Sequence, residues 1–173
     1  MTSDAQPGGA DTQPAVTFRA ATLDDGAAMW RIARDSQVLD VNTSYAYLLM
    51  ARDFGAHSAV AEVGGGVVGY CMSYLRPQDP DTVFVWQIAV DASQRGRGLA
   101  GRLLDAVVDA TGARALESTV TTDNDASNAL FARFAERRGA TETVTAFITH
   151  DHFPPDDVHD AELLHRIEPL TPA

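Results

Sequence analysis

The chain has 173 residues, 45% of them hydrophobic, and this size and composition predict a single globular domain with a substantial core. The formal net charge is −11, from 24 acidic against 13 basic residues, which argues against a nucleic-acid partner and suits a cationic substrate. Because the chain has one cysteine, no secretory signal and no run of about 18 apolar residues, we expect a cytoplasmic protein without disulfide or membrane contact.

The first half of the chain is predicted to contain two helices and three strands. Residues 1–15 are rich in Gly, Pro and polar residues, so we expect a disordered tail before a domain of residues 16–173. Thr22 is the expected N-cap of the first helix, and Asn42 or Thr43 that of the second. The expected elements are a strand at 16–20, helices at 22–35 and 43–54, and strands at 58–63 and 67–75 around a glycine turn at 64–66.

The second half of the chain is predicted to alternate strands and helices. Gly112 and Gly139 are the expected helix ends, and Cys71, in a strand pattern, is expected to be buried rather than a nucleophile. The expected elements are a turn at 77–81, a strand at 83–90, a helix to about 111, a strand at 116–121, a helix from a cap at 122–125 to 138, a strand at 141–149, a loop at 150–160 and a closing strand at 163–167.

A glycine-rich loop between the strand at 83–90 and the following helix has the features of a phosphate site. The first N–H groups of a helix have no partner within it, and together with the helix dipole they favour an anion. Gly96 and Gly98 would let the backbone approach that anion, and Arg95 and Arg97 add positive charge. A Walker loop is excluded because the chain has no lysine, and a dinucleotide fold is disfavoured because this strand is the fourth expected, not the first.

The motif Arg95-x-x-Gly98-x-Ala100, directly after a strand that ends at Val90, resembles the acetyl-CoA loop of the GNAT N-acetyltransferase superfamily. The order of the expected elements agrees with that superfamily. The resemblance implies an α/β (α+β) GNAT fold, with a mixed central sheet of about six or seven strands and about four helices, and acetyl-CoA as co-substrate. It implies cofactor contacts at Ile88, Ala89, Val90, Arg95, Gly96, Arg97, Gly98, Leu99 and Ala100, and also at Asn124 and Phe131.

A second motif, Asn124-x-x-Ser127-x-x-x-Phe131, resembles the helix start N-x-x-A-x-x-x-Y of the same superfamily. In that superfamily the asparagine lies near the cofactor, and the tyrosine often protonates the leaving thiolate. Phe131 has no hydroxyl, so this role is not carried over to it, and the proton donor to the thiolate stays unassigned.

Four stretches occur together as they do in the L-2,4-diaminobutyrate acetyltransferases of ectoine biosynthesis, which this chain resembles from Thr17 to about Ile167. They are Val38 to Tyr45, Val85 to Val90, Thr122 to Ser127 and His159 to Glu162. The resemblance implies acetyl transfer to the 4-amino nitrogen of L-2,4-diaminobutyrate, and a homodimer. It implies substrate contacts at Asp40, Tyr45, Trp86 and Glu162, with His159 ahead of Glu162 at the spacing of one helical turn.

A direct, sequential transfer without an acyl-enzyme is expected. The substrate amine has a pKa near that of lysine, about 10.4, so it must lose a proton before it attacks the thioester. Glu162 is the first candidate for the base, and His159 is the second. A backbone N–H between Ile88 and Val90 is expected to bind the thioester carbonyl oxygen as negative charge develops on it.

Two other functions stay open at this point. The first is a GNAT enzyme that acetylates another small polyamine or a protein N-terminus, and the second is a non-catalytic acetyl-CoA sensor. The loop from His150 is rich in His and Asp, but its spacing fits no recognised zinc pattern, so we expect no metal and interpret Asp156, Asp157 and Asp160 as loop acids. The residue that binds the substrate carboxylate is left unassigned.

Overall fold

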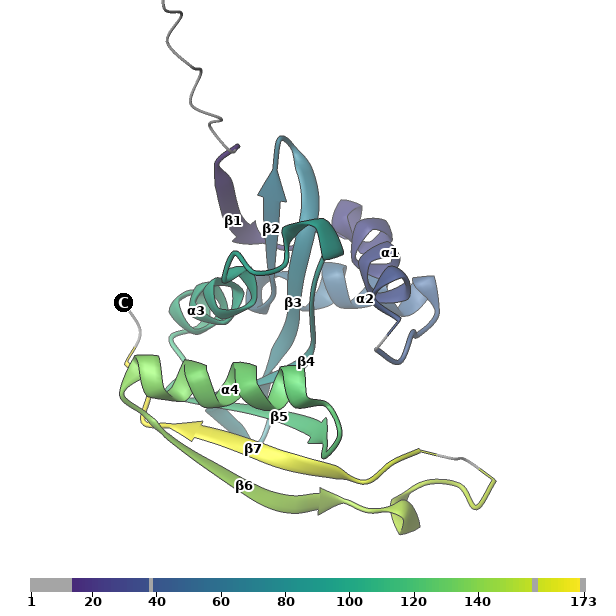
Figure 1. Ribbon diagram of the computed structural model, residues 1–173, viewed down its shortest axis with the longest axis vertical. Helices are drawn as coiled ribbons and strands as arrows, with labels where there is room; N and C mark the ends of the chain where they lie inside the picture. Colours follow the sequence, from purple (N-terminus) through teal and green to yellow (C-terminus); the bar gives the residue numbers. More distant parts are fainter. Residues whose placement is uncertain (1–13, 38, 157–158, 172–173) are drawn as a thin grey trace, which may run out of the picture.

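The strands of the protein form one mixed, seven-stranded sheet in the order β1-β2-β3-β4-β5-β7-β6 (Figure 1). The computed structural model describes residues 14–37, 39–156 and 159–171, so the expected tail at residues 1–13, Val38 and Asp157 lie outside the described residues. The strands are β1 (Val16–Ala20), β2 (Ala59–Val63), β3 (Gly66–Arg76), β4 (Asp79–Val90), β5 (Ala115–Thr121), β6 (Thr141–Ile148) and β7 (Glu162–Glu168). The helices are α1 (Gly26–Ser36), α2 (Ser44–Asp53), α3 (Leu99–Thr111) and α4 (Asp125–Arg138), with short 3-10 turns η1 (Leu23–Asp25), η2 (Gly55–His57), η3 (Ala92–Gln94) and η4 (His150–His152). The expected order of elements is confirmed.

Helices α1 and α2 cover one face of the sheet, and α3 and α4 cover the other (Figure 1). Successive residues of β3 show this division, because Tyr70 and Met72 are buried with α1 and α2, whereas Cys71 is buried with α3 and α4. The alternation is the one that a pleated strand imposes. Cys71 is therefore a core residue, as expected, and burial raises the pKa of its thiol.

The sequence around α3 explains both of its ends. Its buried residues recur at helical spacing, and they are Leu99, Leu103, Leu104, Val107 and Val108. The helix begins after Gly98 and stops before Gly112, where the φ angles are 68° and 67°. Glycine adopts this left-handed conformation without the steric cost that a Cβ brings, so each glycine both permits and marks a helix boundary.

Thr22 is an N-cap, as expected, but of the 3-10 turn η1 that precedes α1. The carboxylate of Asp25, in that first turn, accepts hydrogen bonds from the Thr22 N–H and hydroxyl at 2.8 and 2.9 Å. One expected boundary is wrong. The turn expected at 77–81 is shorter, because Asp79 already pairs with Arg76 across the hairpin. Strand β4 therefore begins at Asp79.

Strands β4 and β5 separate in the middle of the sheet. They run parallel, and they pair only where Thr82–Phe84 lies beside Ala115–Glu117. Beyond that point β4 continues to Val90 against β3, and β5 continues to Thr121 against β7. Beyond that point the two strands no longer pair through their backbones, although the Ser118 hydroxyl donates to the Val85 carbonyl at 3.0 Å, and the opening provides room for a ligand.

Candidate active site

A cavity of about 530 Å³ lies at the opening between β4 and β5. Its wall is built from these two strands, the first turns of α4, the segment before α2, the end of β6 and the loop before β7. Of the residues that the sequence predicts at the site, those that line the cavity are Asp40, Trp86, Ile88, Asn124, Phe131, His159 and Glu162. Segments far apart in the chain therefore meet at one place.

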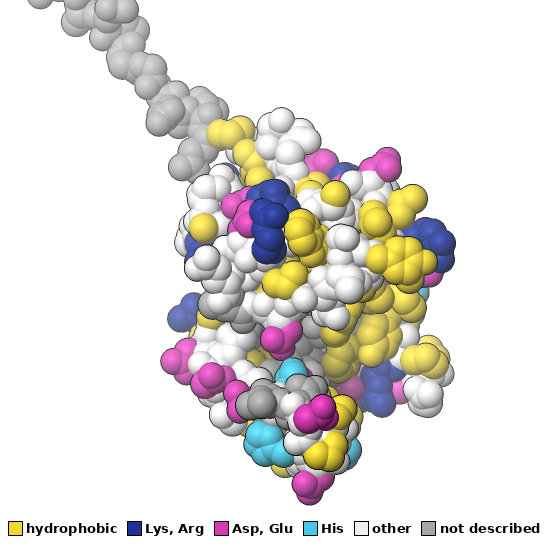
Figure 2. Space-filling model, turned by 90° about the vertical axis from the view of Figure 1, so that its right-hand side faces the viewer, with side chains coloured by type: hydrophobic (Ala, Val, Ile, Leu, Met, Phe, Trp, Pro, Cys, Tyr) yellow, Lys and Arg dark blue, Asp and Glu magenta, His cyan; other side chains and the backbone are white. Residues whose placement is uncertain are grey.

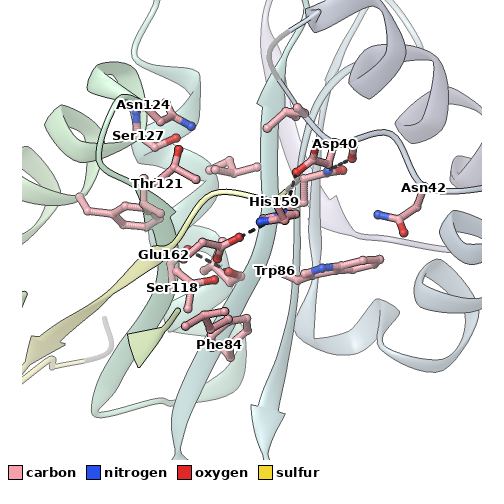
Figure 3. A pocket seen from close by; sticks show the side chains of 18 of the residues that line it. Asp40, Asn42, Phe84, Trp86, Ser118, Thr121, Asn124, Ser127, His159 and Glu162 are labelled. Carbon is pink, nitrogen blue, oxygen red and sulfur yellow. Dashed lines mark hydrogen bonds and ion pairs between the residues drawn. The ribbon is translucent and has the colours of Figure 1, made fainter. Parts of the chain in front are cut away.

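Three titratable side chains form a row across the cavity, as Figure 3 shows. Nε2 of His159 lies 3.3 Å from the carboxylate of Asp40 and 3.7 Å from that of Glu162. The Glu162 side chain is 19% exposed, whereas that of Asp40 is 90% exposed. One carboxylate thus lies inside the cavity and the other at its mouth, with an imidazole between them.

The surroundings of His159 favour its charged form. Its Nδ1 donates a hydrogen bond to the backbone carbonyl of Asp160 at 2.9 Å, and this bond is the largest cause of a pKa raised above the ordinary histidine value. The carboxylates of Asp40 and Glu162 act in the same direction. The ring of Phe153 stacks on the imidazole with centroids 4.4 Å apart. His159 thus lies between two acids in surroundings that raise its pKa.

The spacing of His159 and Glu162 does not reflect a helical turn, contrary to the expectation. Glu162 is the first residue of β7 and pairs with Thr121 of β5, whereas His159 lies in the preceding loop. Nδ1 of His150 donates to the carbonyl of His159 at 2.9 Å. This contact folds the loop back, which brings the His159 side chain toward Glu162.

A β-bulge places Trp86 at the cavity. Met72 of β3 pairs with Gln87, but the next residue, Ser73, pairs with Val85, so Trp86 is the extra residue of β4. Its side chain is 38% exposed and lines the cavity beside Asp40, His159 and Asn42 (Figure 3). Trp86 is thus available to a ligand instead of being part of the core.

Tyr45 is an expected substrate contact that the structure leaves apart from the cavity. Thr43 is the N-cap of α2, as expected, because its hydroxyl accepts a hydrogen bond from the Ala46 N–H at 3.3 Å. Tyr45 consequently lies in the first turn of that helix, where it is 66% exposed. It does not line the cavity, and its role stays a prediction from the resemblance.

The backbone of the glycine-rich loop is arranged as an anion site. Gly96 has a φ of 77° and Gly98 one of 68°, and a Cβ added at either position would meet nothing within 4 Å. The loop surface is therefore open at both glycines. Gly98 contributes no capping side chain to α3, so the N–H groups of Leu99 and Ala100 have no acceptor within the helix.

The charges around this loop also suit an anion. The Arg95 side chain is exposed, and that of Arg97 donates to the amide oxygen of Gln94. Asp91, at the start of the loop, is paired with Arg31 at 3.0 Å, which compensates its negative charge. The two loop arginines therefore dominate the local charge.

Some of the remaining residues expected to contact the cofactor place their side chains in the cavity, and others offer only their backbone. Ile88, Asn124 and Phe131 line the cavity, whereas the side chains of Ala89 and Val90 pack into the two cores and leave only their backbone. Asn124 is the N-cap of α4, and its side-chain oxygen accepts a backbone N–H at 3.1 Å. Phe131 is 1% exposed and gives the cavity an apolar wall with no proton to donate.

Several polar residues of the cavity were not predicted as site residues. They are Asn42, Gln87, Ser118, Thr121 and Ser127. The sequence could have indicated Gln87, because this residue is an amide within the apolar run from Val83 to Val90. No sequence pattern indicated Phe153, because its place beside His159 depends on how the loop folds.

The surface is uneven in charge. Figure 2 shows histidine and acidic side chains at the lower end of the molecule, where Figure 1 shows the loop between β6 and β7, and hydrophobic side chains higher on that face. In the described part of the chain, no group of three or more His, Cys, Asp or Glu side chains is arranged to hold a metal ion. None of the helices in that part is long and apolar enough to cross a membrane.

The sequence matches the profile of the Acetyltransferase (GNAT) family over residues 26–135. It is 53% identical, over 152 residues, to the L-2,4-diaminobutyric acid acetyltransferase of Streptomyces coelicolor, and the match covers 85% of this chain and 89% of that protein. It is 43% identical, over 159 residues, to the protein of that name from Marinococcus halophilus, with coverage of 90% and 91%.

The fold is similar to that of the diaminobutyrate acetyltransferase EctA of Paenibacillus lautus, solved in complex with its substrate L-2,4-diaminobutyric acid and coenzyme A. The TM-score is 0.84 at 35% sequence identity, covering 90% of this chain and 96% of that one. Ard1 from Thermoplasma volcanium has a TM-score of 0.67 at 22% identity, with coverage of 88% and 97%, which is a likeness of fold.

Proposed function

Because this chain belongs to the acetyltransferase (GNAT) family and, within it, to the L-2,4-diaminobutyric acid acetyltransferases, we propose that it transfers the acetyl group of acetyl-CoA to the 4-amino nitrogen of L-2,4-diaminobutyrate, a step of ectoine biosynthesis. The observation that carries the proposal is the row of Asp40, His159 and Glu162 across the cavity between β4 and β5. Diaminobutyrate has two ammonium groups, and carboxylates beside an apolar wall attract and orient such a cation.

The acetyl group passes directly from sulfur to nitrogen. The neutral amine attacks the thioester carbon and forms the new N–C bond, which gives a tetrahedral oxyanion. The C–S bond then breaks, the CoA thiolate leaves, and the proton that the nitrogen loses converts the thiolate to the thiol. Backbone N–H groups between Ile88 and Val90 stabilise the oxyanion, and the loop from Arg95 to Ala100 binds the pyrophosphate. The position of Cys71 supports transfer without an acyl-enzyme, because this buried thiol, with its raised pKa, packs in the core.

Glu162 receives the proton that the substrate ammonium releases. Its carboxylate lines the cavity and is largely buried, so it can both bind the ammonium group and accept its proton. His159 is the weaker candidate, because its surroundings favour the protonated imidazole, which has no free lone pair. In this assignment His159 lies between Asp40 and Glu162 and pairs with both carboxylates.

The working form of the enzyme is a homodimer in the cytoplasm, where acetyl-CoA is available. Exposed apolar side chains on β6, the edge strand of the sheet, support a contact between copies; they are Val144 and Phe147. Sedimentation equilibrium at assay concentrations tests this form, and a mass equal to that of one chain would contradict it.

A panel of amines with acetyl-CoA tests the activity. The panel holds L-2,4-diaminobutyrate, L-ornithine, 1,3-diaminopropane and a short peptide with a free N-terminus, with thiol release as the rate and mass spectrometry and NMR to locate the acetyl group. We expect the highest kcat/KM for diaminobutyrate, with acetylation at the 4-amino nitrogen. Preference for the diamine or the peptide would indicate another GNAT activity, and CoA binding without acetylation of any amine would indicate a sensor.

A further inference from the structure

Gln87 is a buried amide at the centre of a hydrogen-bond cluster behind the cavity. Its Oε1 accepts hydrogen bonds from the hydroxyls of Tyr47 at 2.8 Å and Tyr70 at 2.5 Å, and its Nε2 donates to the backbone carbonyl of Asp40 at 3.1 Å. Both tyrosines are 0% exposed, and Gln87 is 9% exposed. The cluster therefore joins β3, β4 and α2 to the segment that carries Asp40.

The two tyrosine hydroxyls determine which way the amide points. Because both donate to Oε1, the nitrogen of Gln87 must face the Asp40 carbonyl, and a flipped amide would set donor against donor. The rings of Tyr47 and Tyr70 pack edge to face, with centroids 6.4 Å apart, which holds both hydroxyls in place. The cluster thus reaches the segment through the Asp40 carbonyl.

The segment that the cluster reaches lies between Leu39, which packs against the core under α1 and α2, and Thr43, the N-cap of α2. Residues 40–43 belong to no helix or strand, and Val41 is 45% exposed. The Asp40 side chain projects 90% exposed at the mouth of the cavity, where its ion pair is with His159. The hydrogen bond from the Gln87 side chain therefore links the backbone of Asp40 directly to β4, the strand that carries Trp86.

We infer that Gln87 is a positioning residue for substrate binding, which rests on the proposed function of the site. It holds the segment of Asp40 and Asn42 at a defined distance from β4, and so it sets the affinity for the amine substrate. We expect it to contribute little to acetyl-CoA binding, because its side chain bonds Tyr47 and Tyr70 on the sheet face that α1 and α2 cover, whereas the glycine-rich loop leads into α3 on the other face.

Three variants separate this role from a general loss of stability. Gln87→Glu can still accept from both tyrosines but has no N–H for the Asp40 carbonyl. Tyr70→Phe leaves Gln87 intact and removes one of the two donors that orient it. Tyr74→Phe is the matched control, because this tyrosine is also on β3 but its ring packs against Phe54 and Phe84.

We expect the KM for diaminobutyrate to rise about tenfold in Gln87→Glu and by less in Tyr70→Phe, with the CoA affinity near that of the wild type. Amide hydrogen exchange of the peptide that spans residues 39–43 should become faster in both variants and not in Tyr74→Phe. Unchanged KM and unchanged exchange would overturn the inference, as would equal effects of all three variants. If the wild type acetylates no amine, the proposed function fails, and the exchange measurement still decides whether Gln87 holds the segment.

Discussion

Nε2 of His159 lies 3.3 Å from the Asp40 carboxylate, so the loop before β7 and the segment before α2 meet through one ion pair across the cavity mouth. Glu162 lies 3.7 Å from the same nitrogen, on the inner side. An incoming ammonium group would meet two carboxylates that both lie beside the His159 imidazole, whose charged form these carboxylates favour. Substrate binding therefore replaces or shares an existing ion pair, and the enzyme does not have to bring two unpaired acids together.

The raised pKa of His159 predicts a pH-dependent contribution to stability. A group whose pKa is higher in the folded state stabilises the fold fully below its unfolded value, 6.5 for histidine, and this stabilisation is lost as the pH rises through the folded value. We expect His159→Gln to lower the free energy of unfolding more at about pH 5.5 than at about pH 9, measured by urea denaturation.

His152→Gln is the control for that comparison. His152 lies in the same loop, but its Nδ1 contacts the backbone N–H and the hydroxyl of Thr149 at 3.0 Å. This variant controls for the loss of one imidazole from the loop. A His159→Gln effect that is equal at both pH values, or larger at high pH, would show that the imidazole is not stabilised in its charged form.

Glu162→Gln tests the base. The substitution keeps the size and removes the charge, and a positioned general base contributes about 10²- to 10⁴-fold to the rate, so we expect kcat to fall within that range. The rate should then depend more steeply on pH, since the free amine must come from solution. The measurements are kcat and KM across pH, together with CoA affinity, which should not change.

Asp40→Asn is the matched comparison, because the same chemical change is made on the other side of His159. We expect a higher KM for diaminobutyrate and a rate that recovers at high substrate concentration, which is the pattern of lost binding. Recovery of Glu162→Gln by high substrate would likewise assign Glu162 to binding alone. The candidates for the base would then be His159 and a water chain along β4 at Trp86.

Features that depend on a few neighbouring residues were predicted well from the sequence. Gly112 and Gly139 were predicted to end α3 and α4, because only the local backbone conformation matters there. Thr43 was one of the two candidate caps of α2, and Asn124 lies within the stretch 122–125 expected to cap α4; both bond to residues within the next turn. The length of β4 was underestimated, because the start at Asp79 depends on a partner strand. Local propensity carries no information on that partner.

The candidate site was predicted in part, and only through resemblance to a family. That resemblance selected Asp40, Trp86, His159 and Glu162, which share one cavity. The resemblance could not explain the distances between these side chains, because the loop before β7 is positioned by contacts within the folded loop, such as the bond from His150 to the His159 carbonyl. The role of Gln87 could not be predicted from the sequence either, since its hydrogen-bond partners come from three separate parts of the chain.

Burial of Cys71 predicts an unreactive thiol. The residue lies in β3 within the core under α3 and α4, and burial raises its pKa, so little thiolate forms at neutral pH. We expect a thiol reagent to label no cysteine in the native enzyme and one per chain in guanidinium, and iodoacetamide to leave the activity unchanged. Inactivation of the native enzyme by iodoacetamide would contradict both the burial and the direct transfer.

Phe131→Tyr supplies the hydroxyl that many members of the superfamily have at this position. Phe131 is 1% exposed beside the cavity, and its ring lies 5.8 Å from that of His165. We expect little change in kcat, because this enzyme must already protonate the thiolate by another route. The comparison is made on pre-steady-state thiol release. A large increase would show that the residue occupies the place of the usual acid and that protonation limits the rate.

The two glycines at the ends of α3 allow the cofactor loop to be tested with an internal control. Gly98 and Gly112 have φ angles of 68° and 67°, and at both positions a Cβ would meet nothing within 4 Å. Replacing either one by glutamate therefore imposes the same backbone strain, about 1 kcal/mol, on opposite ends of one helix. Only Gly98→Glu places a negative charge at the helix N-terminus where the pyrophosphate is expected.

We expect both variants to lose stability in thermal unfolding, Gly112→Glu the more because its charge lies at the C-terminal end of the helix dipole, and Gly98→Glu alone to lose CoA binding in calorimetry. Gly112→Glu should bind CoA as the wild type does, because the charge lies at the far end of α3. Gly98→Ala, which adds the strain without the charge, should weaken binding less than Gly98→Glu. If Gly98→Glu binds CoA with wild-type affinity, the loop is a connection between β4 and α3, and the pyrophosphate must be bound elsewhere.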